Sequence, residues 1–247
     1  MKISLITVTY NAEEFLESCL ESVICQTYSD LEYIIVDGNS SDYTVNIIRK
    51  FENNVNQLLI EADAGIYDAM NKGLNLATGD IIGTLNADDF LADKNIISKI
   101  AETFSKYNTD IVYGNLNYVS RDKPSEIVRK WRSKIYGKNL FNWGWMPAHP
   151  TFYAKRELFL KYGNYQLDYG SAADYELMLR FMYRNNASAR YLDEIIVNMR
   201  VGGISNSSLK NRLNASTNDL KAMINNGIRF PYLAVCLKPI QKVVQFL

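Results

Sequence analysis

The sequence predicts an α/β protein built on a mostly parallel, Rossmann-like central sheet with helices on both faces. Apolar runs of strand length alternate with segments of helical periodicity as far as about residue 114, which is typical of βαβ units. The 247 residues suffice to bury a core without disulfides. A hydrophobic fraction of 47% and a charged fraction of 22% are ordinary for a globular protein.

The first part of the chain supplies the parallel strands and their connecting helices. Residues 3–9 form a continuous apolar and β-branched run, the pattern of a strand buried on both faces. In segment 13–26, Phe15, Leu16, Leu20 and Val23 recur at helical spacing. The other strands are expected at 33–36, 58–60, 81–85 and 111–113, and the other helices at 43–51, 66–77 and 94–104.

The pattern changes after residue 114. Segments 115–120 and 126–131 flank a polar turn and predict an antiparallel hairpin, and an irregular aromatic segment follows at 141–150. Helices are expected at 156–162, 174–183 and 209–224, and a strand at 191–199. We therefore expect one domain with two halves.

Charge and cysteine content exclude several classes of protein. Lys plus Arg and Asp plus Glu balance at 27 each, so the basic excess typical of nucleic-acid binders is absent and no nucleic-acid partner is expected. Cys19, Cys25 and Cys236 are odd in number and lack zinc-type spacing, which indicates reduced thiols in a cytoplasmic protein. The sequence predicts neither a signal peptide nor a membrane span.

Polar and acidic residues follow each of the first four predicted strands. Because ligands of open α/β sheets bind beyond the carboxyl ends of the strands, these residues are the first candidates for a site. The acidic ones repel one another unless a cation or a donor-rich ligand lies among them, the alternative being ordinary turns and caps. The residues are Thr9, Tyr10, Asn11, Asp37, Glu61, Asp63, Asn86, Asp88 and Asp89.

A metal ion is the expected means of neutralising a bound nucleotide. The sequence contains neither the G-x-G-x-x-G nor the G-x-x-x-x-G-K-[ST] fingerprint. A hard divalent ion held by carboxylates, with phosphate oxygens completing its shell, would serve instead. Segment 86–89, Asn-Ala-Asp-Asp, offers those carboxylates. The alternative is a strand-to-helix turn in which Asp88 or Asp89 caps the next helix.

An ordered series of motifs resembles the family 2 glycosyltransferases, inverting enzymes with the GT-A fold, and in particular the bacterial polysaccharide-biosynthesis subgroup. The series covers roughly residues 1–205, and each motif alone is weak. The segments are ITVTYN at 6–11, SVICQTY at 22–28, IIVDGNSSD at 34–42, DAGIYDAMNKG at 63–73, ATGD at 77–80, LNADD at 85–89, HPTF at 149–152 and AADYEL at 172–177.

The resemblance implies roles for individual residues. It makes Asp88, at the last position of the D-x-D motif, the ligand of Mn²⁺ or Mg²⁺, although Asn86 stands where Asp is usual. It makes Asp174 the catalytic base, although Ala173 stands where Glu is frequent; helix capping is the alternative for Asp174. The implied nucleotide-sugar-binding residues are Thr9, Tyr10, Asn11, Asp37, Asp63, Asn71, Asn86 and Ala87.

Three further residues are candidates for the acceptor or donor-sugar pocket, namely His149, Trp145 and Asp89. The alternatives are a structural histidine, a tryptophan packed between the halves, and an aspartate that supports the metal site from behind or caps a helix. Segment 200–205 contains two glycines and is either a loop that closes over the diphosphate or an ordinary turn.

The resemblance implies a metal-dependent, inverting glycosyltransferase of hexosyltransferase type that acts in bacterial surface polysaccharide biosynthesis. A UDP- or GDP-linked sugar would be the donor, and a saccharide or lipid-linked saccharide the acceptor. The implied GT-A domain is 1–205, with a nucleotide-binding half at 1–114 and an acceptor-binding half at 115–205. The alternatives are a sugar-phosphate nucleotidyltransferase, which usually has a glycine- and arginine-rich first loop, and an inactive nucleotide-sugar-binding module.

Residues 206–247 are expected to form a C-terminal helical extension. Its last part, 230–247, is apolar with two lysines, yet too short and too interrupted by prolines to cross a bilayer. It either packs on the core or makes a peripheral membrane contact, which would hold a cytoplasmic protein at the inner face of the membrane.

Overall fold

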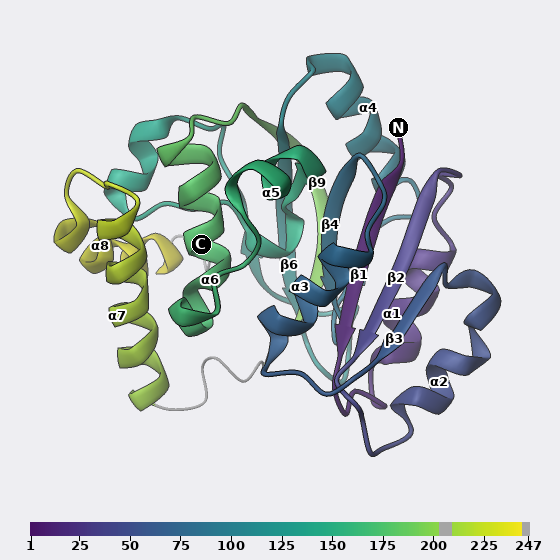
Figure 1. Ribbon diagram of the computed structural model, residues 1–247. Coiled ribbons are helices and arrows are strands. Elements are labelled where there is room, and N and C mark those ends of the chain that lie inside the picture. Colours follow the sequence, from purple (N-terminus) through teal and green to yellow (C-terminus); the bar gives the residue numbers. More distant parts are fainter. Residues whose placement is uncertain (203–208, 244–247) are drawn as a thin grey trace.

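The computed structural model describes the backbone of residues 1–202 and 209–243, and the side chains of these residues except 209–213 and 242–243. Within these ranges nine strands form one sheet in the order β3-β2-β1-β4-β8-β6-β9-β5, with β7 paired to β6. The predicted α/β class with a central sheet between helices is confirmed (Figure 1).

The N-terminal half is the parallel part of the sheet. Its strands are β1 (Ile3–Thr9), β2 (Leu31–Asp37), β3 (Gln57–Ile60) and β4 (Ile81–Asn86). Every residue of β1 is buried because helices cover both faces. Helix α3 packs on β1 and β2 in front of the sheet in Figure 1, and α1 lies behind it beside α2. These helices are α1 (Leu16–Ile24), α2 (Thr44–Lys50) and α3 (Ile66–Leu76).

The remaining strands extend the same sheet with mixed polarity. Strand β8 runs antiparallel to β4 and β6, β9 runs parallel to β6, and β5 and β7 pair antiparallel with β9 and β6. Their bounds are β5 (Phe90–Leu91), β6 (Ile111–Val119), β7 (Ile127–Trp131), β8 (Tyr153–Lys155) and β9 (Ala189–Arg200). The division expected at residue 114 therefore falls inside β6.

Strand β6 is longer than its apolar run because its polar side chains find partners inside the sheet. The amide of Asn115 donates to Asp193 Oδ1 at 3.0 Å, and its Oδ1 accepts the backbone N–H of Ser133 at 2.8 Å. Asn117 donates to Asn198 at 3.2 Å. These hydrogen bonds lower the cost of burying the two amides, although Asn117 Oδ1 has no partner among the described residues, and the strand continues through two residues that are rare in strands.

The other helices lie mainly around the second half. They are α4 (Ile96–Tyr107), α5 (Arg156–Tyr162), α6 (Ala173–Met178), α7 (Leu209–Asn225) and α8 (Pro231–Val243). Short 3₁₀ turns are η1 (Glu52–Asn54), η2 (Lys138–Trp143), η3 (His149–Thr151) and η4 (Leu167–Ala172), and α6 continues as a π-helical turn, η5 (Leu179–Arg184).

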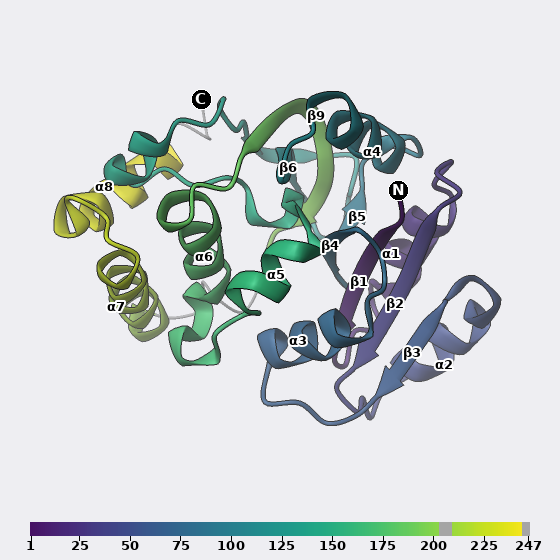
Figure 2. The same ribbon diagram turned by 45° about the horizontal axis from the view of Figure 1, so that its top comes forward.

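The C-terminal helices lie at the end of the molecule opposite α2 (Figures 1 and 2). Helix α8 packs on α7 and η2, and α7 packs on α6 and η4. Within the predicted extension 206–247 the structure describes two helices, α7 and α8, joined by residues 226–230, and the extension as a separate unit stays a prediction. Among the described residues, no helix combines the length and hydropathy that crossing a bilayer requires.

Candidate active site

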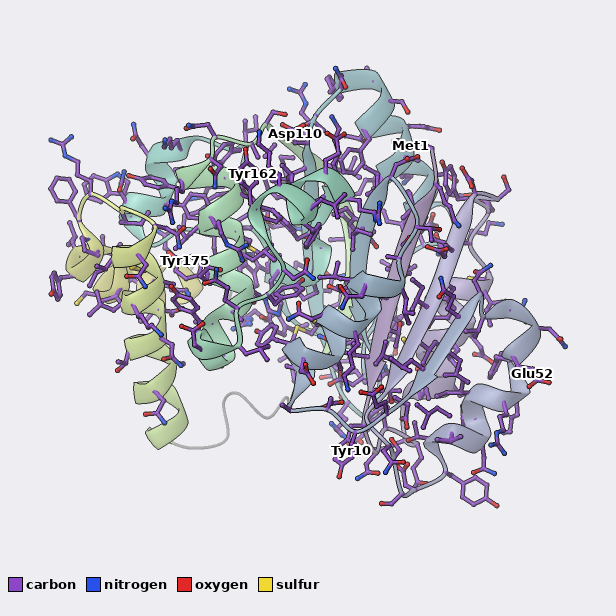
Figure 3. The ribbon with its side chains drawn as sticks, in the orientation of Figure 1. Met1, Tyr10, Glu52, Asp110, Tyr162 and Tyr175 are labelled. Atoms are coloured by element: carbon purple, nitrogen blue, oxygen red, sulfur yellow. The ribbon has the colours of Figure 1, made fainter. Side chains whose placement is uncertain are left out.

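The parallel strands end together at one edge of the sheet. Thr9 is the register partner of Asp37, Val8 is the partner of Asn86, and Asp37 is also the partner of Ile60. Figure 3 shows Tyr10 at this lower edge, at the far end of the strands from Met1. The candidates that follow β1, β2 and β4 are therefore brought to one rim, as the sequence predicts.

Asp37 forms the floor of this edge. Its carboxylate is fully buried and accepts the backbone N–H of Ser40 at 2.9 Å and the Ser40 hydroxyl at 2.6 Å. Asn11 has a φ of 47°, a left-handed conformation that asparagine tolerates better than most residues. In that conformation its N–H donates to Ser40 Oγ and its Oδ1 accepts the N–H of Ser41, both at 2.9 Å. The loops after β1 and β2 are therefore interlocked around Asp37.

Asp63 and Tyr10 lie directly beside Gly38. A Cβ atom at position 38 would overlap Asp63 Oδ2 and lie 3.2 Å from Tyr10 Cδ2, so a larger residue there would displace the Asp63 side chain. Thr9, at the end of β1, has a buried hydroxyl with no hydrogen-bond partner among the described residues. A buried unpaired hydroxyl costs about 1–3 kcal/mol, which a ligand bound at this edge would offset. Five predicted nucleotide-binding residues, Thr9, Tyr10, Asn11, Asp37 and Asp63, thus surround one small region.

The turn after β4 separates the roles of two adjacent aspartates. Asp89 is fully buried; burial raises the pKa of its carboxyl well above the usual range, and the neighbouring Asp88 adds to the shift. It accepts the Asn86 amide at 3.3 Å and the backbone N–H of Arg200 at 3.1 Å. Asp89 therefore supports the turn from behind; it caps no helix, because α4 begins only at Ile96. The Ala87 side chain is buried in the same turn.

Arg200, the last residue of β9, holds this turn in place. Its guanidinium donates to the carbonyl of Asp88 at 2.6 Å and to the hydroxyl of Ser18 at 2.9 Å. It lies 4.7 Å from the ring centroid of Phe15 and 4.8 Å from that of Phe90. Burial lowers the pKa of Arg200, and the carboxylates of Asp89 and Asp88 oppose that shift. This clamp was not predicted, because β9 is more than a hundred residues away in the chain.

Asp88 is the carboxylate available to a metal. Its side chain is partly exposed and makes no hydrogen bond or salt bridge within the described ranges. No group of three or more acidic, histidine or cysteine side chains gathers there in the part of the chain that the structure describes. Mg²⁺ is usually held by one or two carboxylates together with substrate phosphates. The donor set therefore fits an ion shared with a bound diphosphate, and not one caged by protein alone.

Asp174 is the second residue of α6, and its side chain is 17% exposed. Its Oδ1 accepts the backbone N–H of Tyr175 at 2.7 Å, and its Oδ2 lies 3.4 Å from His149 Nδ1. Burial and the nearby Asp174 carboxylate raise the pKa of Tyr67 well above its usual value. Tyr67 belongs to the first turn of α3, two residues after Gly65, whose N–H binds Asp63 at 2.8 Å. The chain between Asp63 and Tyr67 thus connects the edge of the sheet with Asp174.

Asn71 joins the two halves through the backbone. Its amide donates to the carbonyl of Tyr165 at 2.9 Å, and its Oδ1 accepts the N–H of Tyr165 at 3.0 Å. The Tyr165 pKa is raised by burial and then by the charge of Asp174, and a hydrogen bond with Thr84 of β4 opposes the rise. Asn71 therefore positions Tyr165 between β4 and Asp174, while its direct contact with a nucleotide stays a prediction.

Trp145 packs between residues of the two predicted halves. The indole is buried, 5.6 Å from the ring of Phe141 and 6.0 Å from that of Tyr113, both edge-on. This is the packing alternative raised from the sequence, and contact with a sugar stays a prediction. Of the loop expected over the diphosphate at 200–205, residues 203–205 lie outside the described residues, and Gly202, with a φ of 113°, is the last described residue before them.

Four residues that matter to this geometry escaped sequence-based prediction, namely Ser40, Tyr67, Tyr165 and Arg200 as a clamp. Tyr67 had a detectable signal, because it lies inside the motif at 63–73. The others became visible only once distant segments were placed side by side.

Known proteins resemble this chain in sequence. The family model described as Glycosyl transferase family 2 matches residues 4–167, so the Asp37, Asp63 and Asp88 region lies inside the match and Asp174 lies beyond it. A protein of Mycobacterium bovis (strain BCG / Pasteur 1173P2) named PGL/p-HBAD biosynthesis glycosyltransferase is 31% identical over 209 residues, covering 83% of this chain and 79% of that protein.

Solved structures resemble the fold. Staphylococcus aureus TarS 1-349 in complex with UDP aligns with a TM-score of 0.67 at 18% identity, covering 94% of this chain and 68% of that one. Mannosyltransferase PcManGT from Pyrobaculum calidifontis, in complex with GDP-Man and Mn²⁺, aligns with a TM-score of 0.68 at 17% identity, covering 99% of this chain and 72% of that one. At these identities the likeness establishes the GT-A fold alone.

Proposed function

Because the chain belongs to glycosyl transferase family 2, we propose that this glycosyltransferase moves a hexosyl unit from a nucleotide-diphosphate sugar to an acceptor hydroxyl, with inversion at the anomeric carbon. The observation that carries the proposal is the short connection from the Asp37 and Asp63 edge, through Tyr67, to the carboxylate of Asp174. The residues proposed to bind the donor therefore lie near the carboxylate proposed to accept the proton, and a transfer in one displacement step requires this proximity.

The donor nucleotide is assigned to the half formed by 1–114. The Asp37 carboxylate only accepts hydrogen bonds, so it suits the N–H edge of uracil or guanine, and the unpaired Thr9 hydroxyl faces the same region. The related folds of TarS and PcManGT were solved with UDP and with GDP-Man, which supports a UDP- or GDP-linked donor.

Asp88 is the residue assigned to a divalent ion, Mn²⁺ or Mg²⁺. Such an ion, when bound, neutralises charge on the leaving diphosphate. Asn86 and Ala87 belong to the turn, and the buried contacts of Asp89 and Arg200 hold its backbone while the Asp88 side chain stays partly exposed. The Mn²⁺ in the PcManGT structure supports this assignment.

Asp174 is the proposed general base. It removes the proton of the acceptor hydroxyl while the acceptor oxygen bonds to the anomeric carbon and the bond from that carbon to the diphosphate oxygen breaks, its electron pair leaving with the diphosphate. His149, 3.4 Å from Asp174 Oδ2, is assigned to positioning this carboxylate beside the acceptor.

The acceptor is assigned to the half formed by 115–205 and is proposed to be a saccharide or lipid-linked saccharide of a bacterial surface polysaccharide, made in the cytoplasm. The biosynthetic name of the mycobacterial relative supports a cell-surface glycan pathway. Family membership removes the sugar-phosphate nucleotidyltransferase from consideration. An inactive nucleotide-sugar-binding module is the alternative that an experiment must separate.

Substituting Asp174→Asn tests the proposal. A thermal-shift screen of UDP, GDP and their sugars, with and without Mn²⁺, identifies the donor because ligands that bind only the native state raise Tm. With that donor, Asp174→Asn is expected to lower kcat by about 10²- to 10⁴-fold, the usual contribution of a general base, and to keep the thermal shift.

The matched control is Asp168→Asn. Asp168 lies six residues earlier on the surface and pairs with Lys221 at 2.9 Å, away from His149. This variant is expected to retain both donor binding and turnover. A wild-type protein that binds the donor without forming product, from any of a panel of saccharide acceptors, would instead indicate the inactive module.

A further inference from the structure

Helix α8 exposes an apolar face. At 100° per residue, five of its positions fall within roughly one third of the helix circumference. All five side chains are exposed and none is charged, namely Tyr232, Leu233, Cys236, Pro239 and Ile240. Soluble helices normally show the reverse arrangement, with apolar residues turned inward.

The charged side chain of Lys238, within this helix, points inward. Lys238 Nζ donates to Asp219 Oδ1 of α7 at 2.6 Å and lies 3.6 Å from the ring centroid of Tyr175 in α6. Ala234, on the same side of the helix, is fully buried. The apolar face therefore points outward, because the opposite face of α8 packs against α7 and α6.

Close packing fixes the rotation of α8 about its axis. A Cβ atom on Gly144 would lie 2.5 Å from the carbonyl oxygen of Ala234 and 2.7 Å from the backbone nitrogen of Lys238. Backbone approaches this close leave no room for the helix to turn its apolar side toward the core.

Two exposed aromatic residues, Trp143 and Phe230, flank the segments that pack at the start of α8. Trp143 precedes Gly144 and is exposed, and Phe230 is exposed just before the helix begins. The two are held near each other, because the N–H of Arg229 donates to Asn142 Oδ1 at 3.0 Å. Tryptophan and tyrosine at the edge of an apolar surface are typical of side chains that lie at a membrane–water interface.

Charge is distributed unevenly between this end and the rest of the chain. Residues 209–247 contain one acidic residue, Asp219, and therefore carry a net charge of +5, and residues 1–208 carry −5 because the chain as a whole is neutral. The basic residues are Lys210, Arg212, Lys221, Arg229, Lys238 and Lys242. An anionic surface would attract this end and repel the other, orienting the molecule before contact.

We propose that the face formed by Tyr232, Leu233, Cys236, Pro239 and Ile240 binds the surface of an anionic lipid bilayer, with α8 parallel to it. A second copy of the chain fits less well, because two segments of net charge +5 would repel each other across a shared face. Helix α7 connects α8 to η4 and α6, so the membrane-bound end is the end that carries Asp174.

The test is flotation with vesicles of phosphatidylcholine alone and of equal parts phosphatidylcholine and phosphatidylglycerol. The wild-type protein is expected to float with the mixed vesicles and to be released by high salt. Leu233→Ser with Ile240→Ser, at side chains 44% and 58% exposed, is expected to lower the partition coefficient roughly tenfold. Neither change removes a buried contact, so the variant should fold.

The control is a Leu and Ile pair on other surfaces, Leu160→Ser with Ile127→Ser, at 70% and 47% exposure. This pair should float like the wild type. Equal loss in both variants, or no flotation of the wild type with mixed vesicles, would refute the proposal. Sedimentation in vesicle-free buffer adds a second criterion: a wild-type dimer that the Leu233 and Ile240 changes convert to a monomer would assign the face to self-association. None of these outcomes bears on donor binding.

Discussion

At the scale of single residues, the turn that presents Asp88 depends on charges buried behind it. Asp89 accepts the N–H of Arg200, and the Arg200 guanidinium returns to the Asp88 carbonyl. Each group satisfies part of the hydrogen bonding that burial would otherwise leave unpaired. The arrangement explains why two adjacent aspartates differ, one fully buried and one available to a ligand.

Arg200→Lys should therefore weaken the metal-dependent part of donor binding. A single ammonium cannot reach Asp88 and Ser18 in the planar geometry of the guanidinium while lying between Phe15 and Phe90. We expect about tenfold weaker Mn²⁺ binding in the presence of nucleotide, within the range measured when the supports of metal ligands are removed. Calorimetric titration with and without Mn²⁺ measures this difference.

Arg180→Lys is the control for general destabilisation. Arg180 is equally buried and bonds to Glu176 and to the carbonyls of Gly163 and Asn164, away from the Asp88 turn. Arg180→Lys should lower Tm and leave the affinity for Mn²⁺ in the presence of nucleotide unchanged. If both lysine variants lose the same amount of Mn²⁺ affinity, the loss results from lower stability of the fold, and Arg200 has no particular role at the turn.

At the scale of elements, the position of α8 depends on one glycine. Gly144 has a φ of 75° and no space for a side chain beside Ala234 and Lys238. It ends η2 and lets the helix backbone approach, which brings Lys238 to Asp219 and Tyr175. The contact between η2 and α8 therefore depends on the close approach of their backbones as well as on buried apolar area.

Gly144→Ala is expected to loosen α8 from the rest of the domain. The left-handed conformation and the overlap with the helix backbone together should cost about 2–4 kcal/mol of unfolding free energy. Hydrogen exchange should show that the substitution accelerates exchange of the α8 amides relative to the wild type, and does so more than for the amides of the central sheet. The control, Gly137→Ala, has a φ of −140° and its nearest neighbour at 3.9 Å, so a change there of similar size would contradict the argument.

At the scale of the whole molecule, Glu32 of β2 links the amino-terminal ends of β1, β2 and β4 through hydrogen bonds. Its buried carboxylate accepts hydrogen bonds from Lys2, Ser4 and Thr78, which come from the start of β1 and the approach to β4. Burial raises the pKa of Glu32, but these hydrogen bonds outweigh it and lower the pKa to about 2. The network lies at the amino-terminal edge of the sheet, opposite the site.

Acid stability should report this network. A lowered carboxyl pKa adds stability that is complete above the unfolded value of 4.5 and is lost as the pH falls toward about 2. Glu32→Gln should remove roughly 2 kcal/mol of stability at neutral pH and flatten the decline across that window. Urea titrations at several pH values measure both effects. The exposed Glu52, labelled in Figure 3, provides the control Glu52→Gln, which should behave as the wild type.

The local pattern of the chain determined much of the fold. Residues 3–9, 66–77 and 156–162 have strand or helix periodicity strong enough to be assigned before any contact is known, and the structure confirms all three, with the second helix ending one residue earlier at Leu76. The polar residues at the carboxyl ends of β1, β2 and β4 were predictable for the same reason, since parallel strands must end at one edge.

Tertiary structure alone decided which distant groups meet. Nothing local in the sequence indicates that Arg200 contacts Asp88, that Asn71 holds Tyr165, or that His149 lies beside Asp174. These contacts join segments tens to more than a hundred residues apart, and they form because packing of the sheet and helices places polar groups from distant segments within hydrogen-bond reach. Periodicity records how a segment is buried, whereas the partner of a buried charge is a property of the folded chain.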